Sequence, residues 1–486
     1  MIITRYSLFK KTKIIATVGP ASFKKEVLEK IIEKADIIRL NFSFGDHDFY
    51  TKLIEQIRDI SSKNSRNVAI LQDIQGPKIR ISKIKNGKLE LKSNDTLIIK
   101  SNTDHLLDDE ISITYNGLYK DVKPGDKILI SDGIIELEVN KIKDNNIITS
   151  VIQGGLLKEK KGLNVPIKLD IPTITQKDYN DIIFGIQQNM DYIALSFVRS
   201  PSDIIELRKI IEKNKKSHED GNTPGIVAKI ERPEALNEIE KIIELSDAIM
   251  VARGDLGIEL PLEKIPKIQH NIIKYCLKLS KPVIIATQLL YSMVNTARPT
   301  RAEVADVYNS VLGGADCLML SDETASGKYP IKSIEIFNKI IIEAEKDLIP
   351  IQLFFRSEKH ESFDPAHAVA NAACELANDL KAKAIVSFTK SGFTALLISK
   401  NRPNANIIGI TPNKSVLGKL ALFWGVIAKY YPNIKTTDEI INISEKCVLD
   451  EGLAKKGDII IITAGIPFGF SGITNLIKVH KIDSHN

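Results

Sequence analysis

Eight short apolar runs, separated mainly by segments with helical spacing, constrain the fold of this chain most strongly. They are Thr12–Gly19, Asp36–Phe42, Val68–Ile74, Tyr192–Val198, Ile226–Glu231, Ala248–Gly254, Pro282–Gln288 and Asp316–Leu320. Most are continuously apolar, which is typical of strands buried on both faces of a parallel sheet. Between them, Glu234–Leu245 and Arg301–Leu312 have helical periodicity. This alternation predicts an α/β fold, a closed (β/α)8 TIM barrel, with an open doubly wound sheet as the alternative.

One barrel unit is interrupted by a segment of different composition. From about Gly76 to Asp170, short strand-like runs alternate with turn signals, which predicts a small β-barrel domain inserted into a barrel loop. Such a domain on the catalytic side would act as a lid that excludes water. Further along, an Ala-rich helix and more strand-like runs predict an open-sheet α/β domain. The predicted domains are a catalytic barrel (1–75 and 171–348), a β lid (76–170) and a C-terminal regulatory domain (349–486).

The composition argues against several classes of protein. The formal net charge of +6 is spread over 486 residues without a concentrated basic run, so nucleic-acid binding is not expected. The four cysteines form no C-x-x-C pair, which argues against a disulfide framework or a zinc site. No stretch approaches the roughly 20 apolar residues of a membrane helix. We therefore expect a soluble, cytoplasmic protein with no membrane partner.

Two neighbouring strands end in the parts of a phosphate-handling metal site. On Ile226–Glu231, Lys229 and Glu231 share one face because side chains on a strand alternate with period two. Asp255 follows the next strand, so two carboxylates can share a hard divalent cation while the lysine neutralises a phosphoryl group. Taken singly, each residue has an ordinary structural explanation, such as a surface ion pair.

Polar residues of the same kind recur at the ends of other predicted strands. In a barrel these ends converge on one mouth, and the mixture suits a phosphorylated anion together with Mg²⁺. The chain contains neither a G-x-x-x-x-G-K-[ST] loop nor a G-x-G-x-x-G fingerprint, so any nucleotide is bound in another way. The additional residues are Arg39, Asn41, Ser43, Asp73, Lys78, Arg80, Arg253, Gly254, Thr287 and Gln288.

Several segments carry a resemblance to a known family. They are IIRLNFS, LQDIQGPKIR, KGLNVP, VAKIERPEAL, IMVARGDLGIE, VIIATQLLYSM, RPTRAEVADV, MLSDETASGKYP and GDIIIITAGIPFGFSGITN. In this order the chain resembles pyruvate kinase from about Thr12 to the C-terminus. The resemblance implies phosphoryl transfer from phosphoenolpyruvate to ADP, giving pyruvate and ATP, the last step of glycolysis. It also implies a homotetramer whose C-terminal domain carries a site for a phosphorylated allosteric effector.

The resemblance further implies roles for individual residues at the barrel mouth. Arg39 matches the contact to the substrate phosphate. Lys229 matches the lysine that stabilises charge on the transferring phosphoryl group and the forming enolate. Glu231 and Asp255 match the ligands of Mg²⁺ (or Mn²⁺). The pocket for the substrate carboxylate and enolate corresponds to Gly254, Asp255 and Thr287. Thr287, acting through water, is our candidate for protonation of the enolate carbon.

Three further sets of positions follow from the same resemblance. The nucleotide contacts correspond to Asn41, Phe42, Ser43, Phe44 and Arg80, with Lys161 in the lid. A potassium pocket corresponds to Asn41, Ser43, Asp73 and the carbonyl of Ile74. The phosphate loop of an effector site corresponds to Thr389, Lys390, Ser391, Gly392 and Thr394. The effector would be a sugar phosphate or a nucleotide, and an ordinary strand-to-helix cap is the alternative explanation of this loop.

The chain departs from the family pattern at three positions. Phe44 stands where many members have histidine, and Tyr291 stands where an acidic residue is common. Lys78 replaces the acidic residue of many potassium-dependent members. Because a tethered ammonium can supply the positive charge of a bound K⁺, we expect weak or absent K⁺ dependence.

Two other interpretations of the sequence differ in class. One is another Mg²⁺-enolate barrel enzyme, a lyase or aldolase acting on oxo-acids, which would not need Arg80 and Lys161 in a lid. The other is a catalytically inactive binding or scaffold protein, which the intact Lys229, Glu231 and Asp255 argue against.

Overall fold

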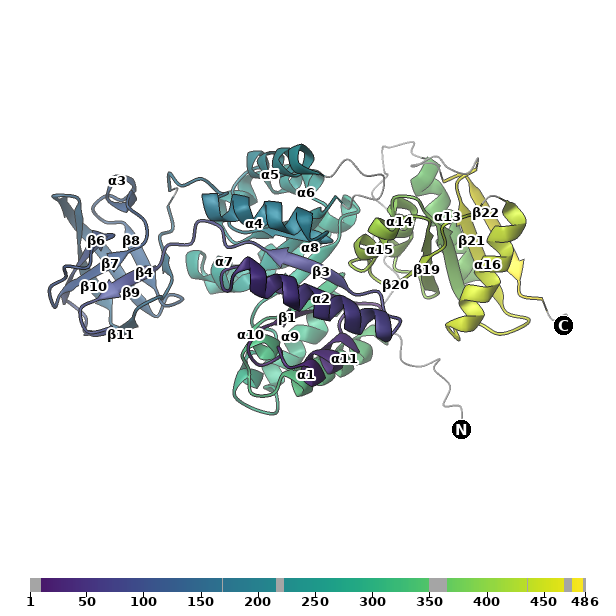
Figure 1. The fold of residues 1–486 in the computed structure, drawn as a ribbon, viewed down its shortest axis with the longest axis horizontal. Coiled ribbons are helices and arrows are strands. Elements are labelled where there is room, and N and C mark those ends of the chain that lie inside the picture. Colours follow the sequence, from purple (N-terminus) through teal and green to yellow (C-terminus); the bar gives the residue numbers. More distant parts are fainter. Residues whose placement is uncertain are drawn as a thin grey trace.

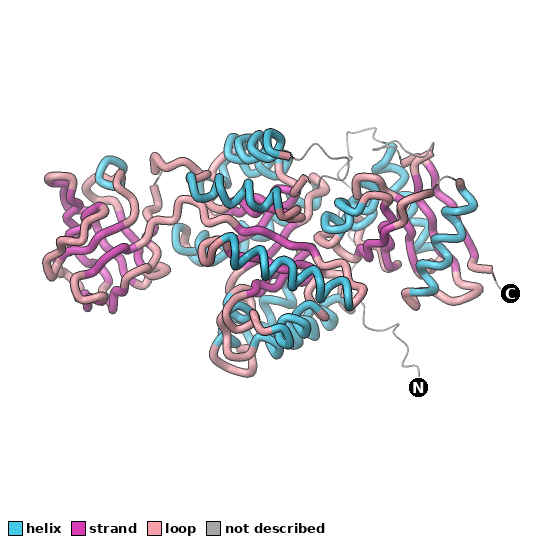
Figure 2. The backbone as a smooth tube through the Cα atoms, in the orientation of Figure 1, coloured by secondary structure: helices cyan, strands magenta, loops and turns pink. Residues whose placement is uncertain are grey.

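The computed structural model describes residues 10–167, 169–215, 223–348, 365–434, 436–466 and 474–483. Figure 1 shows an elongated molecule with the barrel in the middle, the inserted segment at one end and the C-terminal α/β part at the other. Figure 2 shows that strands dominate the inserted end, whereas helices surround the strands elsewhere. No helix in these ranges has the length and apolarity needed to cross a membrane. The domain boundaries stay predictions. The boundary at 349 and residues 467–473 of the closing motif lie outside the described residues.

Eight parallel strands close into a barrel, which confirms the predicted TIM-barrel fold and excludes the open-sheet alternative for this part of the chain. The order around the barrel is β1-β17-β16-β15-β14-β13-β3-β2. The strands are β1 Lys13–Val18, β2 Ile37–Asn41, β3 Ala69–Asp73, β13 Tyr192–Leu195, β14 Gly225–Ile230, β15 Ala248–Ala252, β16 Val283–Ala286 and β17 Cys317–Leu320.

Helices follow the strands, and most cover the outside of the barrel, whereas α7 and α10 lie just after the C-terminal ends of β15 and β17. They are α1 Lys25–Ile32, α2 His47–Lys63, α4 Gln176–Gln187, α5 Pro201–Asn214, α6 Ile239–Leu245, α7 Arg253–Glu259, α8 Ile265–Lys278, α9 Arg301–Leu312, α10 Asp322–Ala325 and α11 Pro330–Glu345. The predicted helix Arg301–Leu312 is confirmed and begins with a capping box. The predicted helix Glu234–Leu245 is wrong in its first half. Pro233–Glu238 forms a 3-10 turn, because Glu238 (φ −125°, ψ 28°) leaves helical geometry before α6 begins.

Alternation along the strands decides which side chains reach the barrel mouth. Val227 on β14 belongs to the apolar cluster inside the barrel, and Lys229 lies two residues further along the same face. Arg39 follows the interior residue Ile37 on β2 in the same way, and Asp73 ends β3. The interior of the barrel is therefore apolar in its middle and charged at the C-terminal ends of the strands.

The insertion forms a strongly curved sheet that leaves and re-enters the barrel after β3. Its strands are β4 Ile81–Ile84, β5 Lys88–Leu91, β6 Thr96–Ser101, β7 Glu110–Ile113, β8 Lys127–Ile130, β9 Ile135–Lys143, β10 Asn146–Gln153, β11 Gly155–Lys158 and β12 Leu163–Asn164. Seven of them follow the order β12-β8-β9-β10-β6-β7-β4, and β11 pairs with β5. An Arg80–Gly162 bridge and a 2.9 Å bond from Ile81 N to Lys161 O join the two outer edges. The sheet thereby approaches the predicted small β-barrel.

The C-terminal part is an open five-stranded sheet, as predicted. Its order is β20-β19-β18-β21-β22, and only β22 runs antiparallel to its neighbour in this sheet. The strands are β18 Ala384–Phe388, β19 Asn406–Thr411, β20 Val426–Tyr430, β21 Ile459–Ala464 and β22 Leu476–Lys481. The helices are α13 Pro365–Asp379, α14 Phe393–Lys400, α15 Lys414–Leu420 and α16 Thr437–Asp450.

The C-terminal domain covers the N-terminal ends of the barrel strands, opposite the mouth. Lys13 at the start of β1 donates to the carbonyl of Val426 at 2.8 Å. Directly before β17, the fully buried Asp316 binds Lys400 at 2.7 Å and Arg402 at 3.0 Å. These contacts connect the domain to the floor of the barrel and leave the mouth to the lid.

Candidate active site

A buried ammonium group lies at the centre of the barrel mouth. Lys229 Nζ is 3.0 Å from Asp73 Oδ1, 3.0 Å from Glu231 Oε1 and 2.8 Å from Ser196 Oγ. These four side chains come from the ends of β3, β13 and β14, so the structure brings together groups that lie far apart in sequence. Ser196 was missed in the sequence, although period two from Ala194 on β13 places it on the same face.

The charges of this cluster stabilise one another. Burial alone would lower the pKa of Lys229, but the neighbouring Asp73 and Glu231 outweigh it and raise that pKa above its ordinary value. Burial would raise the pKa of Asp73, but Lys229 and Arg39 hold it below the usual range. The ammonium and the Asp73 carboxylate are therefore both charged at neutral pH.

Arg39 is held in a fixed orientation beside the lysine. Its Nε donates to Asp73 Oδ2 at 2.7 Å, and its Nη1 donates to Thr17 Oγ1 at 3.0 Å. Thr17 donates in turn to the carbonyl of Leu320 at 2.8 Å, which fixes the hydroxyl. A guanidinium oriented from one side in this way is suited to bind an anion with its remaining edge.

Glu231 and Asp255 form the acidic side of the mouth. Glu231 Oε2 accepts the backbone N–H of Phe197 at 2.7 Å, and Asp255 Oδ1 binds Lys78 Nζ at 3.0 Å. Burial and then the nearby charge of Asp255 raise the pKa of Glu231, against the lowering effect of Lys229. The two carboxylates are thus close enough to repel each other.

A hard divalent cation fits this acidic pair. Binding it would relieve the repulsion between Glu231 and Asp255, and both offer the oxygen ligands that such ions prefer. No cluster of three or more His, Cys, Asp or Glu side chains suited to a metal occurs within the described ranges. The two carboxylates would therefore leave positions open for water and substrate oxygens, as Mg²⁺ sites commonly do.

A strained turn after β16 places Thr287 next to the acidic pair. Gly254 N donates to Thr287 Oγ1 at 2.8 Å, and that hydroxyl donates to the carbonyl of Ala286 at 2.6 Å. Thr287 and Gln288 have φ values of +67° and +56°, which are costly for residues with side chains. Arg253 does not extend into the mouth as a free cation, because it binds the carbonyl of Thr287 at 2.9 Å and Asp306 at 2.8 Å.

The residues proposed to contact the nucleotide lie along one side of the mouth and on the lid. Ser43 N donates to Asn41 Oδ1 at 3.2 Å, which closes a tight turn after β2. The ring of Phe42 is buried and stacks on Tyr50, so a ligand contact there would come from its main chain. Phe44, by contrast, is 67% exposed.

On the lid, Arg80 directly precedes β4, and Lys161 lies between β11 and β12. Arg80 Nη1 donates to the carbonyl of Lys160 at 3.3 Å, and the Lys161 side chain is exposed. Tyr291 is also exposed, at 55%, and its neighbours do not explain the substitution.

The residues of the predicted potassium pocket are near one another, since Asn41 pairs with Asp73 across β2 and β3 and Ser43 N donates to Asn41 Oδ1. Asp73 is already bound by Lys229 and Arg39, and the carbonyl of Ile74 accepts Ser196 Oγ at 2.7 Å. Lys78 instead donates to Asp255.

The predicted effector loop connects β18 to α14. Gly392 has φ +92°, and its N–H donates to Thr389 Oγ1 at 3.0 Å. The carbonyl of Lys390 accepts from Asn413 at 2.9 Å, and Thr394 contacts Thr474 through their hydroxyls. Ser391 lies in the same turn, directly before the glycine. This geometry is compatible both with a cap and with an anion-binding nest.

Comparison with known proteins gives a consistent result along the whole chain. Residues 9–334 match the model of the pyruvate kinase barrel domain, and residues 367–480 match that of the pyruvate kinase alpha/beta domain. The chain belongs to the pyruvate kinase family. It is therefore a kinase, a phosphotransferase, and this family implies a divalent metal cofactor and usually K⁺.

Individual pyruvate kinases resemble the chain over nearly all of its length. It is 43% identical over 477 residues to the enzyme of Geobacillus stearothermophilus, a match covering 97% of this chain and 80% of that protein. It is 41% identical over 478 residues to the enzyme of Clostridium perfringens, covering 97% of this chain and 100% of that one. The crystal structure of a pyruvate kinase from Cryptosporidium parvum superposes with a TM-score of 0.90 at 36% identity, covering 97% and 96% of the two chains.

Proposed function

We propose that the protein catalyses the pyruvate kinase reaction (EC 2.7.1.40), the transfer of the phosphoryl group of phosphoenolpyruvate to ADP in glycolysis. The observation that carries this proposal is the buried Lys229, held by Asp73, Glu231 and Ser196 at the mouth of a barrel that matches this family. This position supports a role for Lys229 in binding a phosphoryl group rather than a purely structural role in packing.

Arg39 would bind the substrate phosphate, since Asp73 and Thr17 fix its guanidinium at the mouth. Lys229 would then lie beside the oxygens that gain charge as the phosphoryl group leaves. Because Asp73 and Glu231 already hold the ammonium in place, no reorganisation is needed when that charge develops.

Glu231 and Asp255 would hold Mg²⁺ or Mn²⁺, which when bound supplies positive charge to substrate oxygens. Lys78 binds Asp255 at 3.0 Å, so this ammonium is placed to share the carboxylate with the ion or to move aside for it. Gly254 and Thr287 would orient the substrate carboxylate. The hydroxyl of Thr287, already bound to the Gly254 N–H, would relay a proton through water to the enolate carbon.

The nucleotide would bind between barrel and lid. We assign its contacts to Asn41–Phe44 on the barrel side and to Arg80 and Lys161 on the lid side. Closure of the lid over the mouth would bring the lid cations to the diphosphate and exclude water from the transfer.

K⁺ dependence should be weak, because Lys78 supplies a permanent cation at the mouth. Replacing K⁺ by tetramethylammonium should leave most of the turnover intact, and a large loss of rate would contradict this assignment. We further propose a cytoplasmic homotetramer, with a phosphorylated effector bound at the Thr389–Thr394 loop. Measuring the native mass and titrating sugar phosphates and nucleotides test these two assignments.

A coupled assay tests the main proposal. Pyruvate formation from phosphoenolpyruvate should require both ADP and a divalent metal. Pyruvate formation that is independent of ADP would favour a lyase or aldolase instead, and no turnover at all would favour a binding protein.

A further inference from the structure

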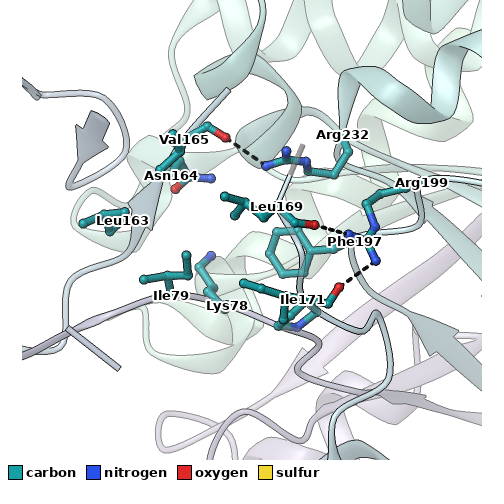
Figure 3. A pocket seen from close by; sticks show the side chains of 11 residues that line it. Lys78, Ile79, Leu163, Asn164, Val165, Leu169, Ile171, Phe197, Arg199 and Arg232 are labelled. Atoms are coloured by element: carbon teal, nitrogen blue, oxygen red, sulfur yellow. Dashed lines mark hydrogen bonds between the residues drawn. The ribbon is translucent and has the colours of Figure 1, made fainter. Parts of the chain in front are cut away.

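The lid is tied to the barrel by a returning segment, residues 165–167 and 169–171, that is not part of any strand. After β12, the chain returns to the barrel through residues 165–171, and the described residues of this stretch belong to none of the sheets. In Figure 3 this returning segment lines a cavity together with Lys78, Phe197, Arg199 and Arg232.

Two guanidinium groups replace the missing sheet partner. Arg232 donates to two backbone carbonyls at 3.3 and 2.7 Å, and Arg199 donates to the next two at 3.0 and 2.8 Å. The four carbonyls, in chain order, are those of Val165, Ile167, Leu169 and Ile171. The four carbonyls are spaced two residues apart along the returning segment.

The two arginines differ in what else they hold. Arg199 donates also to Thr173 Oγ1, two residues beyond the returning segment, and so anchors its barrel end. Arg232 is buried, with only 6% of the residue exposed, and it binds Glu259 at 2.5 Å and Glu234 at 2.9 Å. Arg232 therefore anchors the end of the returning segment that is nearer the lid.

Arg232 connects the returning segment to both elements that carry the acidic pair, Glu231 and Asp255. It directly follows Glu231 at the end of β14. Its partner Glu259 is the last residue of α7, the helix that also contains Asp255. Asn164 of the lid donates to Glu259 at 3.4 Å. One buried guanidinium thus joins β14, α7 and the lid.

We propose that Arg232 is a positioning residue that sets the angle of the lid over the active site. It fixes the returning segment to the supports of Glu231 and Asp255, so the lid cations Arg80 and Lys161 are held at a defined distance from the acidic pair. This inference rests on the proposed function, since it assigns the lid to ADP binding.

The test compares Arg232→Met with a matched control, Arg208→Met. Arg208 also binds one carbonyl, that of Leu245 at 2.8 Å, and one carboxylate, that of Asp247 at 3.2 Å, but it lies on α5 away from the lid. In Arg232→Met the KM for ADP should rise about tenfold, the effect of losing one charged hydrogen bond. The KM for phosphoenolpyruvate should stay within about twofold, because Glu231 and Asp255 keep their own contacts to Phe197 N, Lys229 and Lys78. Hydrogen exchange at residues 163–167 should accelerate.

Arg232→Lys keeps the test decisive if the methionine variant does not fold. Lysine retains the charge that Glu259 needs but cannot bind two carbonyls in fork geometry, so the same selective rise in the ADP KM is expected at smaller size. Unchanged ADP KM and unchanged exchange, or a fall in kcat alone, would overturn the inference. The control should match wild type in every measurement. Failure of the wild-type protein to require ADP would instead overturn the proposed function.

Discussion

Replacing Lys229 by methionine separates the chemical role of the ammonium from its role in holding the site together. Methionine has nearly the same length but no charge. The variant leaves Asp73 and Glu231 buried, with Arg39 as the remaining cation at 2.7 Å from Asp73. We therefore expect two losses, one in activity and one in stability, that respond differently to a divalent metal.

The size of each loss follows from the contacts of Lys229. Removing one partner of a buried ion pair costs about 3–5 kcal/mol of unfolding free energy. Because Arg39 still compensates Asp73, most of the cost falls on Glu231, and we expect a value of about 3 kcal/mol. Glu231 would respond by a further rise in its pKa, which burial already raises. Loss of a preorganised cation at the reacting oxygens should lower kcat by about 10³-fold.

The assay measures turnover and denaturant unfolding with Mg²⁺ and with chelator. Mg²⁺ should restore much of the stability of Lys229→Met, since a cation bound by Glu231 and Asp255 replaces the lost charge, but it should restore none of the activity. The control is Lys63→Met, whose lysine lies on the surface of α2 and is 65% exposed. A variant that keeps more than a tenth of the activity, or whose instability is the same with and without Mg²⁺, would refute this account.

Three further changes probe other parts of the structure. Asp316→Ala leaves two buried cations uncompensated, so it should lower the unfolding free energy by about 3–5 kcal/mol. The unfolding transition, followed by the fluorescence of Trp424, the one tryptophan in the chain, should then have its midpoint at a lower denaturant concentration. Burial raises the pKa of Glu259 to about 7, so its contribution to unfolding free energy falls as pH rises from about 4.5 to 7. Glu259→Gln should flatten the pH dependence of denaturation in that window. Gly76→Ala should lower the melting temperature and weaken Mg²⁺ activation, because a Cβ at φ +67° would lie 2.9 Å from the ring of Phe197.

The barrel could be predicted because two simple periodicities determine it. Continuous apolar runs gave all eight strands, and period two placed Lys229 and Glu231 on one face. Parallel strands then bring their C-terminal ends together, whatever the residues between them. The charged mouth follows from these rules without any knowledge of side-chain conformations.

Other features could not be predicted from such rules. Ser196 lies within an apolar run and has the composition of an ordinary buried hydroxyl until Lys229 is placed 2.8 Å away. The role of Arg232 could not be predicted, because it binds backbone carbonyls of a segment some 65 residues earlier. Backbone partners leave no side-chain pattern in the sequence. The strands β4 and β7 are hard to recognise in the sequence because each has only four residues and includes charged or hydroxyl side chains.

The balance of charge at the mouth is a reason to expect that the proposed reaction depends on a metal. The three cations Arg39, Lys78 and Lys229 face three carboxylates, those of Asp73, Glu231 and Asp255. With all groups ionised, the protein therefore offers no net positive charge to a phosphorylated carboxylate, because its cations are already paired. A divalent cation on the acidic pair would change that balance, and it would also release Lys229 and Lys78 from part of the attraction of their carboxylates. Substrate anion and metal should consequently bind with mutual enhancement, and either alone should bind weakly.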